Sequence, residues 1–315
     1  MTEASWVPLR TAWEQSLYGE RGFYRHNRPA DHFRTSPQVA ASFAEAVVAL
    51  ARDRNLSSIC DIGAGGGELL TQVHRIDPDL RLTGVEVRPP PEDLPQTIGW
   101  EREMPTGLTG LVFANELLDN IPCDVVELDF DRWCRLVEVD VLTGDDRLGP
   151  VVSGDQWAWL ATWWPMTEPG QRAEVGISRD ALWAGVCAAN PQALCVCVDY
   201  GHLAADRPWG GSLSSYRGGV QTAVAYDGWH DITAHVAVDS IAASVTATVR
   251  RQRDVLMELG IDGARPPIER AHADPVGYLR DLSRASDRAE LIAAGGLGDF
   301  VWVSRSPGDR SACVR

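Results

Sequence analysis

The 315-residue sequence predicts an α/β protein with a mostly parallel, twisted sheet and helices on both of its faces. Two observations predict this class. From Leu56 onward, short apolar runs typical of buried strands alternate with stretches of helical periodicity. In the first of these, the run 59–62 passes through a cluster of glycines into a helix that begins near Glu68. This order of strand, tight turn and helix is typical of a parallel sheet that binds a ligand at its edge.

The N-terminal part of the chain is expected to form a helical cap over residues 1–56. A helix is predicted over 9–18, followed by an aromatic and cationic stretch over 22–33. Thr35 or Ser36 then caps a second helix, which Pro37 opens and which runs to about residue 53. Its apolar residues recur at helical spacing, so one face should be buried.

The core of the sheet is expected within residues 57–200. The predicted strands cover 58–62, 82–86, 97–101, 110–115 and 193–200. An insert at about 122–190 separates the last two strands, with a β-hairpin over 125–130 and 134–141. It also holds four tryptophans, which we expect to pack a lid onto the core rather than to stack on a ligand: Trp157, Trp159, Trp163 and Trp164.

The rest of the chain should supply substrate-side loops and helices over 201–292 and a closing strand and tail over 293–315. A glycine-rich loop covers 209–219. Shorter elements follow, namely a helix over 238–243, a late core strand over 245–249 and a helix over 252–260. A helix over 276–293 then leads to the closing strand over 300–304.

The glycine turn itself indicates which ligand the sheet binds. A dinucleotide-binding fingerprint has glycines at its first, third and sixth positions, and Glu68 occupies the sixth position counted from Gly63. Instead Gly63, Gly65 and Gly67 alternate directly after Asp61. A carboxylate there would repel a pyrophosphate but can hold the ammonium group of an amino-acid moiety. S-adenosyl-L-methionine carries that group and no phosphate, so it is the predicted cofactor.

Polar residues at the other strand ends should converge on the same crevice, because ligands of open α/β sheets lie outside the carboxyl ends of the strands. Glu86 ends the second strand about 20 residues beyond the turn, where a carboxylate can accept both ribose hydroxyls. Glu101, or its neighbour Glu103, is a candidate acceptor for the adenine amino group. Asn115, Glu116 and Asp119 follow the fourth strand and are predicted to bind cofactor or substrate, although a helix cap is an alternative for the asparagine.

Composition limits the partners of the protein. A net charge of −15 argues against non-specific nucleic-acid binding and favours cationic substrates or basic partners, although acidity also serves solubility. We find no apolar run long enough to span a membrane and no secretory signal, so we expect a cytoplasmic protein. The cysteines and histidines show no metal-ligand spacing, and no metal is predicted. Cys195 and Cys197 should be core residues on one face of a strand. Four aromatic residues could form a partner surface or pack internally: Trp6, Trp13, Trp209 and Trp229.

Several segments in order resemble the MidA family of S-adenosylmethionine-dependent methyltransferases, which includes the mitochondrial complex I assembly factor that methylates an arginine. The matching segments are GFYRHNRPADHFRTSPQVAASFA, DIGAGGGELL, GVEVRP, FANELLDNIPCDVVEL, VDYGHL, GSLSSYRGG, HDITAHVAVDSI and QRDVLMELGI. They extend from Gly22 to about Ile261. The resemblance implies a Rossmann-like class I methyltransferase fold, S-adenosyl-L-methionine as cofactor and S-adenosyl-L-homocysteine as product.

The resemblance also implies where ligands bind. Cofactor contacts would come from Thr35, Ser36, Gly63, Gly65, Glu86, Asn115 and Glu116. The substrate side would be lined by Asp199, Tyr200, Tyr216, Arg217 and the segment from Asp231 to His235.

The predicted chemistry is transfer of a methyl group to a nitrogen, such as that of an arginine in a protein or peptide. A guanidinium is protonated at neutral pH, so carboxylates must hold it and one of them must take a proton. The candidates are Glu116, Asp119, Asp199 and Asp231, with His235 as an alternative base. Departures from the commoner family pattern keep a small-molecule or modified-peptide acceptor open, as well as an assembly or scaffold protein without turnover. The oligomeric state also stays open, with a dimer among the candidates.

Overall fold

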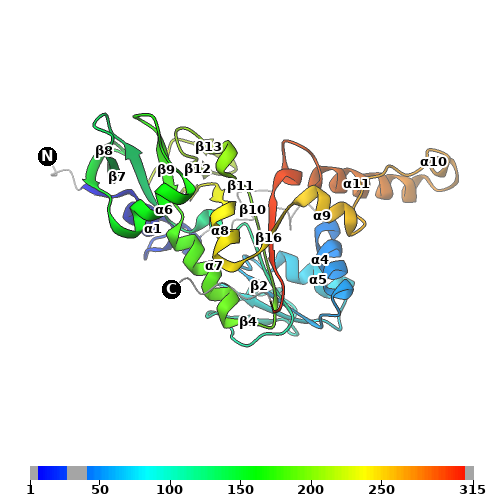
Figure 1. Ribbon diagram of the computed structural model, residues 1–315. Coiled ribbons are helices and arrows are strands. Elements are labelled where there is room, and N and C mark those ends of the chain that lie inside the picture. The colour runs from blue at the N-terminus through cyan, green and yellow to red at the C-terminus, as the bar shows by residue number, and fades with distance from the viewer. Residues whose placement is uncertain (1–5, 27–40, 309–315) are drawn as a thin grey trace.

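The computed structural model describes residues 6–26 and 41–308. Its largest element is a seven-stranded sheet in the order β16-β17-β10-β5-β2-β3-β4, near the centre of Figure 1. Its strands are β2 (Ser58–Ile62), β3 (Arg81–Val85), β4 (Gly99–Glu101), β5 (Leu111–Asn115), β10 (Leu194–Asp199), β16 (Thr248–Arg251) and β17 (Val301–Arg305). The five strands from β10 to β4 are parallel, whereas β17 is antiparallel to both of its neighbours. The predicted α/β class with a mostly parallel sheet is confirmed.

Helices cover both faces of this sheet, as the sequence predicts (Figure 1). One face carries α4 (Ala41–Asp53), α5 (Glu68–Ile76) and α9 (Gln252–Glu258), and the other carries α7 (Ile177–Ala189) and α8 (Val238–Val245). Successive side chains of β10 point to opposite faces of the sheet. Leu194, Val196 and Val198 enter the first hydrophobic core, which lies under α4, α5 and α9. Cys195 and Cys197 enter the second core, so their predicted place in the interior is confirmed.

Three aromatic rings fix the first core. Phe43 of α4, Phe113 of β5 and Trp302 of β17 are all nearly inaccessible to solvent. Their ring centroids lie 5.6–6.1 Å apart in tilted and edge-on arrangements. Such contacts add to the burial of apolar area and connect an N-terminal helix, a central strand and the last strand of the described chain.

The insert between β5 and β10 builds a second, antiparallel sheet. It contains β1 (Trp6–Pro8), β6 (Asp124–Leu128), β7 (Cys134–Asp140), β8 (Asp146–Val151) and β9 (Arg172–Val175). The predicted hairpin is confirmed as β6 and β7, whereas β8, β9, α6 (Gly154–Trp163) and α7 were not predicted as separate elements. Because β1 pairs with β7, the N-terminus and the insert form one unit.

Two tryptophans of the insert, Trp159 and Trp164, are buried, whereas Trp157 is 54% exposed. Trp159 and Trp164 pack with Val126 and Ala173 in a core that belongs to the insert itself, not to the large sheet. Helix α1 (Leu9–Tyr18) buries Trp13 completely against the other face, so this residue cannot belong to a partner surface.

The chain after β10 forms smaller elements. They are β11 (Gly201–His202), β12 (Ser214–Arg217), β13 (Val220–Thr222), β14 (Asp231–Thr233) and β15 (Val236–Ala237). The predicted glycine-rich loop therefore contains a strand. Helix α8 is longer than predicted, since Val245 lies on the same buried face as Val238 and Ile241, and β16 begins only at Thr248.

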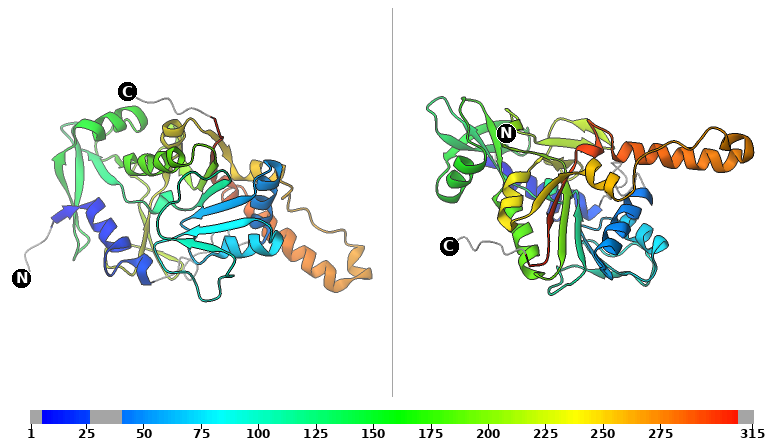
Figure 2. Two further views of the ribbon diagram at one scale, coloured as in Figure 1. Left: turned by 90° about the horizontal axis from the view of Figure 1, so that it is seen from below. Right: turned by 45° about the vertical axis from the view of Figure 1, so that its right-hand side comes forward.

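A helical arm leaves the body of the molecule near its C-terminal end. It consists of α10 (Arg270–Ala273) and α11 (Pro275–Leu291) and projects away from both sheets in Figures 1 and 2. Arg284 and Arg288 of α11 both bond to Glu45 of α4 and hold the base of the arm. Among the described residues, none of the helices has the length and apolar character needed to cross a membrane.

Candidate active site

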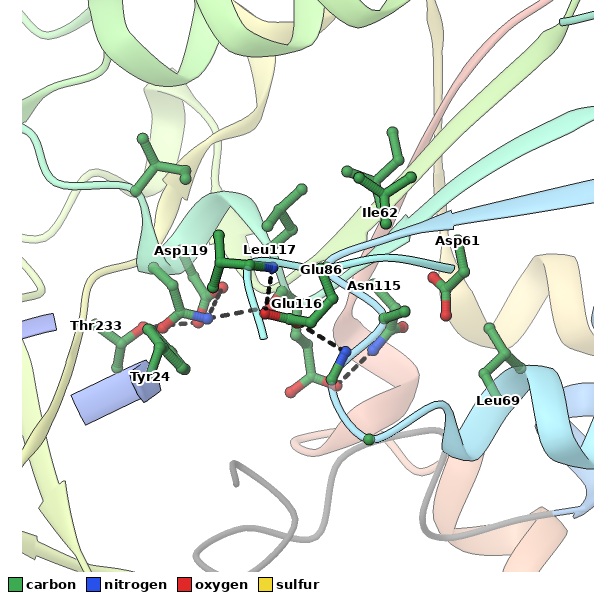
Figure 3. Close-up of a pocket in the computed structure, with 18 of the residues that line it drawn as sticks. Tyr24, Asp61, Ile62, Leu69, Glu86, Asn115, Glu116, Leu117, Asp119 and Thr233 are labelled. Carbon is green, nitrogen blue, oxygen red and sulfur yellow. Dashed lines mark hydrogen bonds between the residues drawn. The ribbon is translucent and has the colours of Figure 1, made fainter. Parts of the chain in front are cut away.

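A cavity of about 540 Å³ lies at the carboxyl ends of β2, β3, β5 and β10. Residues of α1, α2 (Phe23–His26), β12 and β14 complete its wall. In Figure 3, Asp61 and Leu69 lie at one end and Tyr24, Asp119 and Thr233 at the other, with Glu86, Asn115 and Glu116 between them. The ends of these strands therefore converge on one cavity, as predicted.

The glycine turn after β2 forms one wall of the cavity. Gly63 and Gly65 have φ angles of 72° and 59°, a region that side chains with a Cβ rarely adopt. The backbone amides of Gly63 and Ala64 both donate to the carbonyl of Val85 at 2.9 and 3.2 Å, which fastens the turn to β3. A Cβ on Gly63 would lie 2.9 Å from Leu117. Glycine is therefore needed at Gly63 both for conformation and for packing.

Asp61 is the buried carboxylate in front of this turn. It is 4% exposed and lines the cavity, and no described residue forms a hydrogen bond with its side chain. Burial, together with the charges of Glu68 and Glu86, raises its pKa to about 8. A cationic ligand in the cavity would supply a partner that the described residues do not provide.

Glu86 continues the wall beyond β3. Its Oε2 accepts a hydrogen bond from the amide of Gly65 at 3.0 Å, and its Oε1 accepts one from the amide of Val87 at 2.8 Å. These bonds fix the carboxylate across the mouth of the glycine turn. The amide of Arg88 also donates to Oε1 at 3.4 Å, so Oε2 is the oxygen that can accept a further hydrogen bond from a ligand hydroxyl.

Asn115 and Glu116 follow β5. The Asn115 Nδ2 donates to Glu116 Oε1 at 2.9 Å, whereas the buried Asn115 Oδ1 accepts no hydrogen bond from the described residues. Glu116 has a φ of 51°, which is uncommon for a residue with a side chain, and its amide donates to Val198 at 2.8 Å. Backbone strain of this kind is often retained at binding sites.

These residues fit S-adenosylmethionine. The buried carbonyl oxygen of Asn115 and the carboxylate of Asp61 accept no hydrogen bond from residues 6–26 or 41–308, so both can accept from an ammonium group. Ile62, Leu69 and Leu117 provide apolar surface between the polar groups. Six carboxyl groups line the described cavity against one cationic side chain, Arg102; they belong to Asp61, Glu68, Glu86, Glu116, Asp119 and Asp231. This excess of negative charge suits cations and disfavours phosphates.

Two buried carboxylates, Asp119 and Asp231, mark the other end of the cavity. Asp119 lies in the 3₁₀ helix η2 (Leu118–Asn120) and accepts from the hydroxyls of Thr233, at 2.7 Å, and Tyr200. Asp231 of β14 accepts from the hydroxyl of Tyr24 at 3.0 Å. Burial raises the pKa of both carboxyl groups. Tyr216 of β12 lines the same end, as predicted for the substrate side.

Asp199 has a different place from the one predicted. Its Oδ2 accepts from the amides of Leu118 and Asp119 at 2.9 and 3.2 Å, and its Oδ1 accepts from the amide of Tyr200 at 3.0 Å. It does not line the cavity. Asp199 therefore positions η2 from behind, and its assignment to the reacting groups is corrected.

Other predicted site residues also lie off the cavity. Glu101 is exposed at the end of β4, and its neighbour Arg102 faces the cavity instead. Gly67 caps the start of α5 with a φ of 75° but does not line the cavity. The side chain of Arg217 lies on the exposed face of β12. His235 is exposed, with its ring edge-on to Tyr200 at 5.0 Å. The predicted contacts from Thr35 and Ser36 lie outside the described residues.

The structure adds residues that sequence reasoning missed. Tyr18 at the end of α1 lines the cavity and donates to the carbonyl of Asn120 at 3.1 Å. Tyr24 reaches Asp231 from α2, 207 residues away in sequence. Their only signal was the aromatic character of residues 18–24, which gives no indication of the strand they would meet. Arg179 of α7 was also missed, because a basic residue in a helix gives no sign of burial.

Comparisons with known proteins agree with this geometry. Residues 70–255 match a family model described as "Putative S-adenosyl-L-methionine-dependent methyltransferase". No curated protein sequence matches the chain.

Two solved structures from Burkholderia thailandensis share the fold. One is a superfamily protein bound to S-adenosyl-homocysteine; it is 21% identical, with a TM-score of 0.78 over 97% of this chain and 89% of the other. The second is a native crystal structure of an uncharacterised superfamily protein, also 21% identical with a TM-score of 0.78, over 97% of this chain and 88% of the other. The family model covers more than half of the sequence, so the chain belongs to this family of S-adenosylmethionine-dependent methyltransferases, and S-adenosylmethionine is its cofactor.

Proposed function

We propose that this methyltransferase transfers the methyl group to a nitrogen, and that its acceptor is an arginine or another cationic nitrogen group in a protein or peptide. The observation that carries this proposal is the lining of the cavity, where carboxyl groups outnumber cationic side chains by six to one among the described residues. The resemblance to the MidA family supports the same acceptor class. The sheet order, with a single antiparallel strand β17 between β10 and β16, supports a Rossmann-like class I methyltransferase fold.

The cofactor is proposed to occupy the end of the cavity formed by β2, β3 and β5. Asp61 and the Asn115 carbonyl oxygen would hold the ammonium group, Glu86 would accept from the ribose hydroxyls, and Gly63 and Gly65 would let the backbone approach the ligand. When bound there, S-adenosylmethionine supplies an electrophilic methyl group on a sulfonium. The protein contributes orientation, exclusion of water and removal of a proton.

The acceptor is proposed to enter the end lined by Asp119, Asp231 and four tyrosines, which are Tyr18, Tyr24, Tyr200 and Tyr216. Buried carboxylates stabilise a cation far more effectively than exposed ones, because water does not screen them. Aromatic faces add cation–π attraction for a guanidinium or ammonium group. A neutral hydroxyl acceptor would gain nothing from this charge.

Cofactor binding is tested by calorimetry with S-adenosylmethionine and with NAD. We expect the first ligand alone to bind, and Gly65→Val to weaken its binding at least tenfold. Gly107→Val is the matched control: Gly107 has a φ of 71°, close to the 59° of Gly65, and is exposed away from the cavity. Equal affinity losses in both variants would contradict the proposed role of the turn.

The acceptor class is tested by incubating the protein with tritiated S-adenosylmethionine and a protein lysate, followed by acid hydrolysis and amino-acid analysis. We expect the label in methylated arginine or another N-methylated residue. Label confined to the small-molecule fraction would replace the proposal with a biosynthetic small-molecule acceptor. The same assay on the Asp119→Ala variant should lose the label, while the variant still binds the cofactor.

A further inference from the structure

Two carboxylates face the acceptor end of the cavity, and their surroundings differ. Asp119 and Asp231 come from η2 and β14, which lie together because the amide of Ala234 donates to the carbonyl of Asp119 at 3.1 Å. They are only 3% and 4% exposed. Pairs of acids in one site often take different roles when their partners differ.

The carboxylate of Asp119 accepts from three side chains and keeps room for a further donor at Oδ1. Its Oδ1 accepts from Asn120 Nδ2 at 2.9 Å, and its Oδ2 accepts from the hydroxyls of Thr233 and Tyr200. Arg179, whose guanidinium donates to the carbonyl of Asp119 at 2.8 Å, adds a nearby positive charge. Burial raises the pKa of Asp119, and the hydrogen bonds and Arg179 oppose that rise, since donors to a carboxylate favour its ionised form. The same bonds fix the carboxylate in orientation.

The carboxylate of Asp231 is nearly free by comparison. Its Oδ1 accepts from Tyr24, and Oδ2 accepts from no side chain of residues 6–26 or 41–308. Burial and the charge of Asp119 raise its pKa to about 7, while the Tyr24 hydrogen bond opposes the rise. A carboxyl group with an open oxygen and a pKa close to working pH is suited to accept a proton.

We infer that Asp231 is the proton acceptor of the methyl transfer, held by Tyr24, and that Asp119 is the fixed carboxylate that orients the cationic acceptor. This inference rests on the proposed function and adds a division of labour to it. Tyr24 is a positioning residue, because it acts through Asp231.

The step balances as follows for a guanidinium acceptor. The lone pair of the attacking nitrogen forms the new N–C bond to the methyl carbon while the C–S bond breaks, and the bonding pair stays on the sulfur, which becomes a neutral thioether. The nitrogen releases its proton to an oxygen of Asp231. One positive charge enters on the sulfonium and one on the guanidinium. After the transfer, one positive charge remains on the methylated guanidinium, and the released proton neutralises the carboxylate of Asp231.

The test compares Asp231→Asn with Asp119→Asn, using S-adenosylmethionine and the peptide acetyl-Gly-Arg-Gly-amide. We expect Asp231→Asn to lower kcat by about 100-fold or more with KM changed less than threefold, since general-base catalysis contributes about 10²–10⁴-fold. Asp119→Asn should mainly raise KM. A kcat of Asp231→Asn within threefold of wild type would overturn the inference.

A second readout does not depend on turnover. At pH 6, binding of the cationic peptide should displace the proton held by Asp231, and calorimetry in two buffers of different ionisation enthalpy measures this release. We expect the release in wild type, a smaller release in Asp119→Asn because the charge of Asp119 raises the pKa of Asp231, and its loss in Asp231→Asn. Release that persists in Asp231→Asn and vanishes in Asp119→Asn would assign the proton to the other carboxylate and overturn the inference.

Tyr24→Phe covers the case in which Asp231→Asn fails to fold. Removing the hydroxyl takes away the hydrogen bond that favours ionised Asp231, so the pH at which kcat reaches half its plateau should rise, with little change in KM. The groups facing Asp231 are Asp119 from η2, Tyr18 and Tyr24 from α1 and α2, and Tyr216 opposite it on β12. An unchanged pH profile in Tyr24→Phe would contradict its positioning role and the inference.

The proposed function and the inference fail in distinguishable ways. A wild-type protein that binds S-adenosylmethionine but forms no N-methyl product on the peptide or in lysate contradicts the proposed function, and the inference falls with it. A wild-type protein that methylates the peptide, together with an equally fast Asp231→Asn variant, overturns the inference alone.

Discussion

Four of the six aspartates that are buried among the described residues lie in or beside the cavity and differ in their hydrogen-bond partners. The carboxylate of Asp61 has no described hydrogen-bond partner, Asp231 has Tyr24, and Asp119 has three side-chain donors. Asp199 accepts three backbone amides. The hydrogen-bond partners of an aspartate, and not the residue type, therefore decide whether its carboxylate can bind a ligand or instead stabilises the fold.

The buried carboxylate of Asp61, which has no partner among the described residues, should make the free protein less stable as pH rises. Its pKa is about 8 in the folded chain and near the ordinary 3.8 in the unfolded chain. Between these values the unfolded chain binds fewer protons, so the free energy of unfolding falls as pH increases. Asp61→Asn should therefore match wild type near pH 4 and exceed it by about 1 kcal/mol or more at pH 8, since each unit of pKa difference is worth about 1.4 kcal/mol.

Urea unfolding of the cofactor-free protein at several pH values measures this difference. Asp79→Asn, at an exposed turn, serves as the control and should follow wild type at every pH. The same Asp61→Asn variant should bind S-adenosylmethionine at least tenfold more weakly. A variant that is less stable than wild type at pH 8 would show that Asp61 has a stabilising partner in the free protein.

At the scale of elements, the site depends on how η2 is held after β5. Its amides are bound by Asp199 at the end of β10, and its carbonyls by Arg179 of α7. Strand β10 and helix α7 of the insert, both later in the chain than η2, thus fix the loop that carries Asp119. The loop is positioned by elements that are distant in sequence.

Asp199→Asn should weaken this support without touching the cofactor. An asparagine side chain has one acceptor oxygen and cannot replace a carboxylate that accepts three amides, so we expect a loss of about 1–3 kcal/mol in unfolding free energy. Methyl transfer should fall, while the affinity for S-adenosylmethionine stays within a few-fold of wild type. Asp262→Asn, where an exposed carboxylate accepts one amide at 3.0 Å, is the control and should change neither quantity. Unchanged stability in Asp199→Asn would contradict the support role.

Arg179→Lys tests the other half of the support. The Arg179 guanidinium is 2% exposed and donates to the carbonyls of Asp119, Ile121 and His235. A lysine ammonium cannot span three carbonyls in a planar fork, so we expect a loss of about 2–4 kcal/mol and a lower kcat. Arg75→Lys, exposed on α5, is the control. Thermal unfolding and single-turnover rates measure both effects, and a stable, fully active Arg179→Lys would remove Arg179 from this role.

At the scale of the whole molecule, two sheets with separate cores meet around one cavity. The large sheet lines the proposed cofactor end, and the N-terminal helices and the strands after β10 line the proposed acceptor end. Stability should therefore depend on the apolar cores far more than on surface charge pairs. The base of the helical arm illustrates this, because Arg284, Arg288 and Glu45 are partly exposed and screened by water.

Trp302→Ala and Glu45→Gln compare these two contributions. Trp302 is 1% exposed, packs against Phe43 and Phe113, and donates to Gln252 at 3.2 Å, so its truncation should cost about 3–5 kcal/mol. Glu45→Gln should cost about 1 kcal/mol or less. Denaturant unfolding followed by circular dichroism gives both values. Comparable losses in the two variants would mean that the arm is part of the cooperative core.

The sequence by itself determined the large sheet and the residues at the proposed cofactor end of the cavity. Strand β2 was predicted to the residue, and β5 and β10 to within one residue at each end, because their continuous apolar runs and the glycine turn are local signals. Asp61, Gly63, Gly65, Glu86, Asn115 and Glu116 line the cavity as predicted, since parallel strands necessarily end at one edge.

Only the tertiary structure decided the acceptor end. Tyr18 and Tyr24 reach it from helices whose sequence does not specify a partner, and Tyr24 meets Asp231 across 207 residues. Whether a polar residue at a strand end faces the ligand or the backbone depends on the loop packed beside it. For that reason Asp199 binds amides, Glu101 points to solvent and Arg102 faces the cavity. Local patterns fix strands and turns, whereas contacts between distant segments fix the orientation of the side chains that carry the chemistry.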